Sequence, residues 1–163
     1  DTDIQERLSR WHPLSLRGEI IHREEKYFYV DCYNASPASM ADSFNAFNSI
    51  MEPTLRRLYV LGCMAELGKA SPDLHYEVGQ LLKLRPEDKV LIIGDYACEM
   101  RDGIRLSGNE NNEVSVLNSL DDIRDSVSEF NGAVFLKGSR IYKLEKLIPP
   151  PMAEESLEKR EAC

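Results

Sequence analysis

Short apolar segments of strand composition alternate with amphipathic helical segments along most of this chain. Parallel strands need a long connection between them, and a helix that packs back on the sheet is the usual one. The alternation therefore predicts an α/β domain of three layers, with a largely parallel sheet covered by helices on both faces. The sheet should contain about six strands, of which the first two form an antiparallel hairpin at its edge. The expected strands are 18–21, 27–30, 58–61, 90–93, 114–117 and 133–136.

Helix starts are marked by a serine followed by a proline or an acidic residue. This pattern occurs at Ser36-Pro37, at Ser71-Pro72-Asp73 and at Ser119-x-x-Asp122. Apolar residues then recur at helical spacing and predict the faces that pack on the sheet. In chain order, these are Met40, Phe44, Phe47 and Met51; Leu74, Val78, Leu81 and Leu82; Ala97, Met100 and Ile104; Leu120, Ile123, Val127 and Phe130; and, in a final helix, Ile141, Leu144, Leu147 and Ile148.

Both ends of the chain differ from this central pattern. Residues 1–16 contain a short helical pattern that His12-Pro13 ends. They are either a linker from an upstream domain or an N-terminal helix packed on this one. Residues 17–148 form the predicted domain, and residues 149–163 form a charged tail that we expect to be flexible.

Composition excludes several classes of partner. The 163 residues suffice for one domain with a proper core, and their net charge is −8 without any basic stripe. Nucleic acid and anionic membrane surfaces are therefore poor partners. No apolar run reaches membrane-spanning length, and the cysteines show no C-x-x-C pair, which favours reduced thiols in a cytoplasmic protein.

The carboxyl ends of parallel strands meet at one edge of a sheet, where ligands bind in open α/β folds. That edge should collect residues 31–34, 62–68, 94–96 and 137–140. The first of these loops holds a carboxylate, a phenol and a carboxamide. Helix N-termini behind Ser36, Ser71 and Ser139 should add backbone N–H groups that favour an anionic ligand.

Several familiar site motifs are missing from the sequence. It contains no G-x-x-x-x-G-K-[ST], no G-x-G-x-x-G and no G-x-S-x-G, and His12, His22 and His75 lack metal-ligand spacing. The residues by themselves thus predict a Rossmann-like domain with a ligand-binding edge of unnamed chemistry.

Four motifs in register resemble the D-alanyl-D-alanine-adding members of the Mur ligase family. Residues 31–40, D-C-Y-N-A-S-P-A-S-M, are similar to D-x-Y-N-A-[NS]-P-x-S-M. Residues 17–19 resemble an R-x-E motif, and residues 136–140, L-K-G-S-R, resemble [VL]-K-G-S-R. Residues 61–68, L-G-C-M-A-E-L-G, with His75 and Val78-Gly79 downstream, are similar to L-G-D-M-x-E-L-G…H-x-x-V-G.

The resemblance implies ATP-dependent amide ligation in peptidoglycan precursor synthesis. In such enzymes ATP phosphorylates the carboxylate of a UDP-MurNAc-tripeptide, and the amine of D-alanyl-D-alanine attacks the acyl phosphate. The chain looks like the C-terminal domain alone, whose partners would be the N-terminal and central domains of the same protein. The central domain would hold most of the ATP and Mg²⁺ site, so we expect no activity from this fragment by itself.

The resemblance also implies roles for individual residues. The nucleotide would contact Arg17 at the phosphates, Asp31 at the ribose hydroxyls, and Tyr33 and Asn34 at the nucleoside. Arg17 and Lys137 would be catalytic. The acyl phosphate and dipeptide would lie near Lys137, Gly138, Ser139 and Arg140, with Glu66 on the substrate side.

Less specific roles remain open for the same residues. Asp31 could cap a turn, Tyr33 could be a core aromatic, and Arg17 and Lys137 could be solvated charges. Glu66 could face water, and His75 could sit on the exposed side of its helix.

One position departs from the family pattern. Cys63 stands where these ligases usually carry aspartate, and a thiol supplies no fixed charge at neutral pH unless its pKa is depressed. Either the aspartate is dispensable here, or the contribution of this loop to the site is weakened. A binding module without ligase activity, or the same domain of a sister Mur ligase, is the alternative interpretation.

Overall fold

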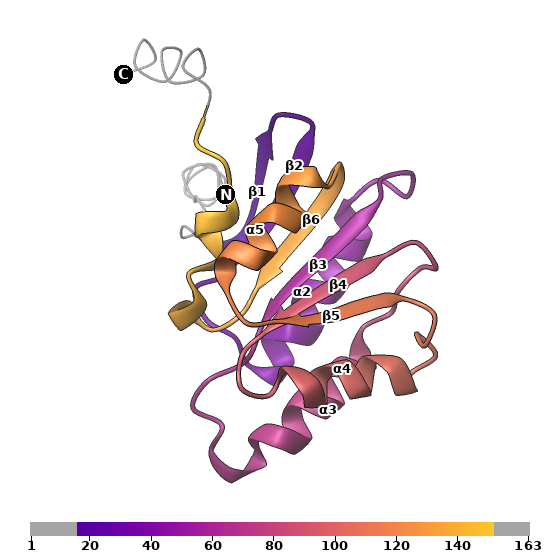
Figure 1. Cartoon of the computed structure of the whole chain (residues 1–163), viewed down its shortest axis with the longest axis vertical. Coiled ribbons are helices and arrows are strands. Elements are labelled where there is room, and N and C mark those ends of the chain that lie inside the picture. Colours follow the sequence, from indigo (N-terminus) through magenta and orange to yellow (C-terminus); the bar gives the residue numbers. More distant parts are fainter. Residues whose placement is uncertain (1–15, 152–163) are drawn as a thin grey trace, which may run out of the picture.

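The computed structural model describes residues 16–151, which form a six-stranded sheet with helices on both faces (Figure 1). The strands are β1 (Arg17–Arg23), β2 (Lys26–Asp31), β3 (Arg57–Gly62), β4 (Lys89–Ile93), β5 (Glu113–Leu117) and β6 (Gly132–Lys137). The helices are α2 (Pro37–Ile50), α3 (Ser71–Leu81), α4 (Ala97–Leu106) and α5 (Leu120–Glu129), with short 3₁₀ turns η1 (Gly68–Ala70), η2 (Arg140–Tyr142) and η3 (Leu144–Leu147). The helix expected before residue 16 and most of the expected tail lie outside the described residues.

The strand order is β1-β2-β6-β3-β4-β5. β1 and β2 pair antiparallel, and every other neighbouring pair is parallel. The predicted fold class and edge hairpin are therefore confirmed. The last strand in sequence, β6, inserts between β2 and β3, so the loops after β2 and β6 become neighbours.

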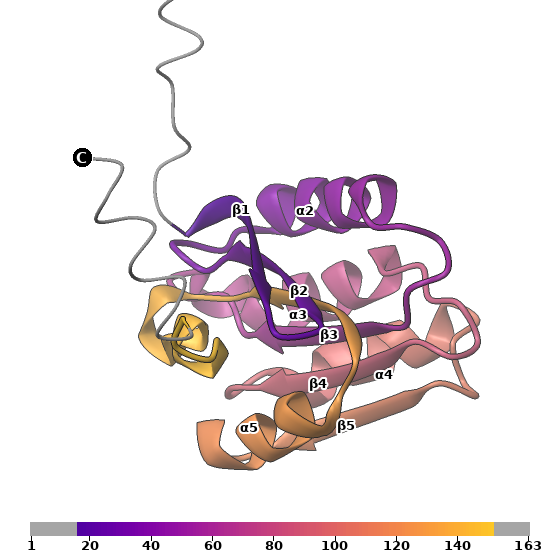
Figure 2. The same cartoon turned by 90° about the horizontal axis from the view of Figure 1, so that it is seen from above.

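Two apolar cores lie on opposite faces of the sheet. α2, α3 and α4 cover one face, where Met40, Phe47 and Met100 are fully buried. α5 and η3 cover the other, with Ile123 and Leu144 fully buried. Figure 2 shows α2 and α5 on opposite sides of the strands. Among residues 16–151, none of the helices combines the length and the hydrophobicity that a membrane-spanning segment needs.

Serine caps begin two of the predicted helices. Ser36 and Ser39 form a reciprocal capping box at the start of α2, and Ser119 accepts a hydrogen bond from the Asp122 N–H at the start of α5. The expected cap at Ser71 is wrong, because Ser71 is already helical and its hydroxyl donates to the Gly68 carbonyl. The turn η1 precedes it and takes the place of a side-chain cap.

The expected final helix is also wrong. Lys143 adopts a left-handed conformation, with φ of 51°, and splits this segment into η2 and η3. Leu144 and Leu147 are nevertheless buried as their spacing predicted, whereas Ile141 is exposed. Leu81, expected in the core face of α3, is 50% exposed, because α3 ends there and the chain turns inward at Leu82.

Two glycines let α3 and α4 pack backbone to backbone. A Cβ atom added at Gly103 would lie 2.0 Å from the Tyr76 carbonyl oxygen, and one at Gly79 would lie 2.2 Å from the Met100 carbonyl oxygen. Both contacts are with backbone atoms, so a larger residue could fit only if the helices moved apart.

Substitution of Gly103 by alanine tests this contact. Helix propensity alone would stabilise the variant by about 1 kcal/mol, but the clash should destabilise it by about 2–3 kcal/mol. Urea unfolding of the wild-type and Gly103→Ala chains measures the difference. Arg105→Ala, an exposed change in the same helix, should leave the unfolding free energy within about 0.5 kcal/mol. A gain in stability for Gly103→Ala would contradict the close approach.

Candidate functional site

A polar pocket of about 300 Å³ lies where β2 and β6 end. Five of its lining residues, Arg17, Asp31, Tyr33, Asn34 and Lys137, were singled out from the sequence as site residues. Ser36, the N-cap of α2, and Ser39, in its first turn, complete the lining. The expected meeting of the 31–34 and 137–140 loops at one edge of the sheet is therefore observed.

Parallel pairing of β2 with β6 sets Asp31 directly opposite Lys137. The Lys137 ammonium lies 2.8 Å from Asp31 Oδ2 and donates to the Asn34 carbonyl oxygen at 3.1 Å. The Lys137 side chain is only 1% exposed, so its charge is balanced within the protein instead of by solvent. A buried charge with these partners ties the end of β6 to the turn that follows β2.

Asp31 also accepts a hydrogen bond from the Ser43 hydroxyl, which comes from the second turn of α2. Behind it, burial raises the pKa of the Tyr29 phenol; a hydrogen bond with Ser43 lowers this pKa and the negative charge of Asp31 raises it. Asp31 is thus bound to side chains of β6 and α2, which differs from the simple turn-capping role. In this turn, the Asn34 carboxamide oxygen accepts from the Ala35 N–H at 2.8 Å.

Arg17 and Tyr33 lie together at the mouth of the pocket. The guanidinium carbon of Arg17 is 4.0 Å from the centroid of the Tyr33 ring, and Tyr33 is 50% exposed. Tyr33 is therefore not a core aromatic. The Leu16 carbonyl accepts hydrogen bonds from the Cys32 and Tyr33 N–H groups, which fixes the start of β1 against this turn.

The remaining predicted residues do not line this pocket. Gly138 passes close to Gly62, where an added Cβ would lie 2.5 Å from the Gly62 Cα, and Ser139 is buried. Arg140 is half exposed and forms an ion pair with Glu145. Glu66 is exposed in a left-handed conformation. Their predicted roles toward a substrate stay predictions.

Cys63 is buried, and desolvation raises the pKa of its thiol to about 12. Nearby carboxylates at Asp95 and Glu99 add to this effect, while a hydrogen bond from the Tyr96 backbone opposes it. The thiol is thus neutral at physiological pH and does not replace the charge of the usual aspartate. It packs beside Gly94, where an added Cβ would lie 2.8 Å from the sulfur.

His75 is fully buried, so the alternative that it sits on the exposed side of its helix does not hold. Its Nε2 accepts from the Met64 N–H at 2.9 Å, and its Nδ1 lies 2.6 Å from the Ser71 carbonyl oxygen. An N–H can only donate, so Nε2 carries no hydrogen and Nδ1 is the donor. His75 therefore holds the loop after β3 against α3.

The role of Ser43 was not predicted from the sequence. Ser36, the N-cap, and Ser39 and Ser43 within α2 follow one another at helical spacing, and this pattern is the signal that the sequence offers. This serine pattern is hard to recognise, because the apolar residues of the same helix dominate its sequence.

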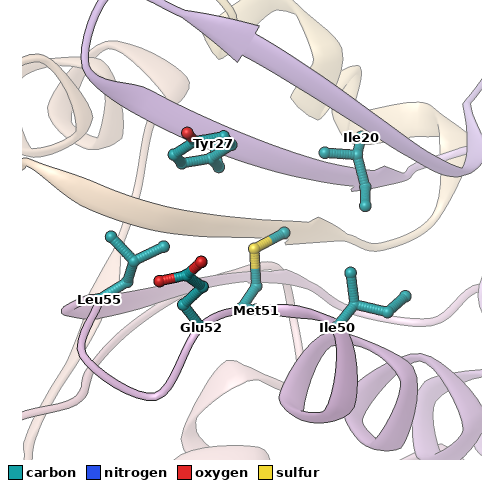
Figure 3. Close-up of a pocket in the computed structure, with 6 residues that line it drawn as sticks. All are labelled: Ile20, Tyr27, Ile50, Met51, Glu52 and Leu55. Carbon is teal, nitrogen blue, oxygen red and sulfur yellow. The ribbon is translucent and has the colours of Figure 1, made fainter.

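A second pocket, of about 330 Å³, is of a different kind (Figure 3). It lies between the β1–β2 hairpin and the end of α2, away from the carboxyl ends of the parallel strands. Its lining residues are Ile20, Tyr27, Ile50, Met51, Glu52 and Leu55. With one carboxylate and no cation in its lining, it is unsuited to a phosphate ligand. Within residues 16–151, no three His, Cys, Asp or Glu side chains gather as a metal site would require.

Comparison with known proteins relates the chain to one family. Residues 16–140 match the family described as Mur ligase, glutamate ligase domain. The UDP-N-acetylmuramoyl-tripeptide–D-alanyl-D-alanine ligase of Treponema pallidum (strain Nichols) is 29% identical over 149 residues, which are 90% of this chain and 32% of that protein. The chain thus spans about a third of the length of the curated relatives it matches.

Solved structures share the fold. The crystal structure of MurF from Acinetobacter baumannii matches with a TM-score of 0.74 at 24% identity, covering 90% of this chain and 32% of that one. The structure of MurF ligase from Thermotoga maritima in complex with ADP matches with a TM-score of 0.62 at 24% identity, covering 94% and 34%.

A double-mutant cycle tests the buried ion pair. Asp31→Asn should destabilise the chain by about 3 kcal/mol, because it leaves the Lys137 ammonium buried without a counter-charge. Adding Lys137→Met should recover part of this loss, with a coupling energy of about 1–3 kcal/mol from urea unfolding. The exposed pair of Lys89 and Glu113 is the matched control, and Glu113→Gln should cost less than about 1 kcal/mol. Additive effects at Asp31 and Lys137 would contradict the pairing.

Thiol labelling tests the burial of Cys63. Burial raises the pKa values of Cys32 and Cys63 to about 12, so their thiolate fraction at pH 8 is on the order of one in ten thousand. Iodoacetamide should therefore modify the exposed Cys98 in the native protein and spare Cys32 and Cys63, as read by peptide mass mapping. Denaturation in urea should make these three thiols reactive. Native labelling of Cys63 as fast as Cys98 would mean that the loop after β3 opens readily.

Proposed function

This chain belongs to the Mur ligase family, and from that premise we propose that it is the C-terminal domain of an ATP-dependent ligase that adds D-alanyl-D-alanine to a UDP-MurNAc-tripeptide. Residues 1–16 would then be the hinge from a central ATP-binding domain, and residues 149–163 a tail. The full enzyme would act in the cytoplasm in peptidoglycan precursor synthesis, and through it in cell shape and division.

The observation that carries this proposal is the single polar pocket shared by Arg17, Asp31, Tyr33, Asn34 and Lys137. Motifs distant in sequence supply these residues, and each occupies the position at which the family motif places it. Relatives that cover 90% of the chain carry the same named activity, which supports the choice of substrate over that of a sister ligase.

In the proposed reaction, the tripeptide carboxylate attacks the γ-phosphorus of ATP, which releases ADP and forms an acyl phosphate. The amine of D-alanyl-D-alanine then attacks the acyl carbon, the C–O bond to phosphate breaks, and an amide forms. The phosphate groups carry most of the charge in both steps. Mg²⁺, held mainly by the central domain, would neutralise part of it.

On the nucleotide side, we assign the ribose hydroxyls to Asp31 and the nucleoside to Tyr33 and Asn34. Arg17 would leave the Tyr33 ring and approach the phosphates when the domains close. An exposed cation stacked on an exposed ring is held weakly, so this exchange costs little. A guanidinium placed there offsets charge that develops during phosphoryl transfer.

Lys137 has a less direct part in this proposal. Its ammonium is buried and bonded to Asp31 and Asn34, so it would act chiefly by positioning the nucleotide-reading turn. A contact with the acyl phosphate, as the family resemblance implies, would require this pair to open on domain closure.

The substrate side would be formed by Gly138, Ser139, Arg140 and Glu66. Arg140 is paired with Glu145 at the surface and could exchange that partner for the dipeptide carboxylate, which a guanidinium binds through two hydrogen bonds. Neutral Cys63 would contribute only packing, within the loop after β3.

The test is an ATP-dependent phosphate-release assay on the full-length protein. Release should require both UDP-MurNAc-tripeptide and D-alanyl-D-alanine, and residues 1–163 alone should release none. Release independent of either substrate would favour a different activity, and the absence of a G-T-N-G-K-T-like loop upstream in the coding sequence would favour a binding module.

Variants of the full-length enzyme test the assigned roles. Arg17→Ala should lower kcat by about a hundredfold or more through loss of charge stabilisation, and Lys137→Ala should lower kcat/KM for ATP comparably. Arg105→Ala, an exposed change on α4, serves as the control and should leave both values unchanged. Wild-type turnover in both Arg17→Ala and Lys137→Ala would reject these assignments.

A further inference from the structure

Ser43 is a polar side chain buried at the boundary between the candidate site and the core. It is 4% exposed and lies on α2 between the core residues Met40 and Phe44 and the pocket. A buried hydroxyl without a hydrogen bond would destabilise the fold, so its partners are informative. Ser43 donates to Asp31 Oδ2, and its hydroxyl also lowers the pKa of the Tyr29 phenol, which burial raises.

Both protein donors to the Asp31 carboxylate bind the same oxygen. Ser43 and Lys137 each donate to Oδ2, and no group within residues 16–151 donates to Oδ1. Asp31 lines the pocket, and its side chain is 17% exposed. The arrangement therefore fixes one carboxylate oxygen and leaves the other available to a ligand in the pocket.

Two donors from different elements restrict the rotation of this carboxylate. Lys137 approaches from β6, whereas Ser43 approaches from α2, whose first turn is held by the reciprocal cap of Ser36 and Ser39. Lys137 alone would still permit rotation about the Cβ–Cγ bond of Asp31, since an ammonium can donate to a carboxylate oxygen from many directions. The Ser43 hydroxyl, on a packed helix, supplies the second fixed point.

We propose that Ser43 is a positioning residue that aims Asp31 Oδ1 at a ribose hydroxyl and so makes the site selective for ribonucleotides. This inference rests on the proposed function, in which Asp31 contacts the ribose of ATP. Ser43 does not itself touch the nucleotide, and its contribution passes through the carboxylate. Its loss should therefore affect recognition of the sugar and leave recognition of the dipeptide unchanged.

The test compares ATP with 2′-deoxy-ATP and 3′-deoxy-ATP in the phosphate-release assay of the full-length enzyme. The wild type should prefer ATP over at least one deoxynucleotide by about tenfold or more in kcat/KM, as expected for one hydrogen bond to a charged group. In Ser43→Ala this preference should fall to within about threefold, while KM for D-alanyl-D-alanine stays within about twofold of the wild-type value.

Ser49→Ala is the matched control. Ser49 lies on the same helix and donates to the Asn45 carbonyl on the exposed side, so its removal should preserve the full preference for ATP. Ser43→Thr keeps a hydroxyl and should restore most of the preference. If Ser43→Ala does not fold, Ser43→Cys, which has a similar size and a weaker donor, carries the same comparison and should show a reduced preference.

The outcomes separate the two proposals. A wild type that prefers ATP and a folded Ser43→Ala that keeps the same preference would overturn the role of Ser43. A wild type that ligates but accepts both deoxynucleotides as well as ATP would overturn the ribose contact and this inference with it. A wild type without substrate-dependent phosphate release would overturn the proposed function itself.

Discussion

Parallel pairing between β2 and β6 is the constraint on which the candidate site depends. It sets Asp31 opposite Lys137 at the ends of two strands that are far apart in sequence. Lys137 is 1% exposed, and an ammonium so buried requires a counter-charge and further acceptors. Asp31 and the Asn34 carbonyl meet this requirement. The contacts that allow the lysine to be buried also hold the turn that would bind a nucleotide. The same interactions therefore stabilise the fold and set the geometry of the site.

The sequence predicted the architecture because apolar periodicity and serine caps depend on local physics. The alternation of strands and helices, the edge hairpin and the caps at Ser36 and Ser119 needed no tertiary contact to be recognised. The segment 140–148 could not be predicted in the same way. Its leucines are spaced as in a helix and are buried, but the left-handed Lys143 divides it, and only packing against β6 and α5 decides that conformation.

The site was predicted in part, for a related reason. Motif positions identified Asp31, Tyr33, Asn34 and Lys137, and the topology rule for parallel sheets brought them to one edge. The sequence did not indicate which atoms Lys137 would bond, because its side chain could equally have been solvated. Ser43 was missed since its function comes from a contact across elements. The burial of His75 could not be decided from the sequence, because a buried imidazole with two backbone partners leaves no periodic signal.

The contacts around the site fall into two physical classes, which bear on how such a domain could work. The Asp31–Lys137–Ser43 contacts are buried, and breaking them would leave a buried charge without a partner. The Arg17–Tyr33 stack and the Arg140–Glu145 pair lie at the surface, where water and salt weaken them. A ligand that brings phosphate or carboxylate groups can replace the partners of these exposed arginines at low cost. In the proposed function, closure over a nucleotide that leaves Lys137 in its positioning role would then need no change in the buried contacts, and the domain would move as a rigid body while Arg17 and Arg140 exchange partners.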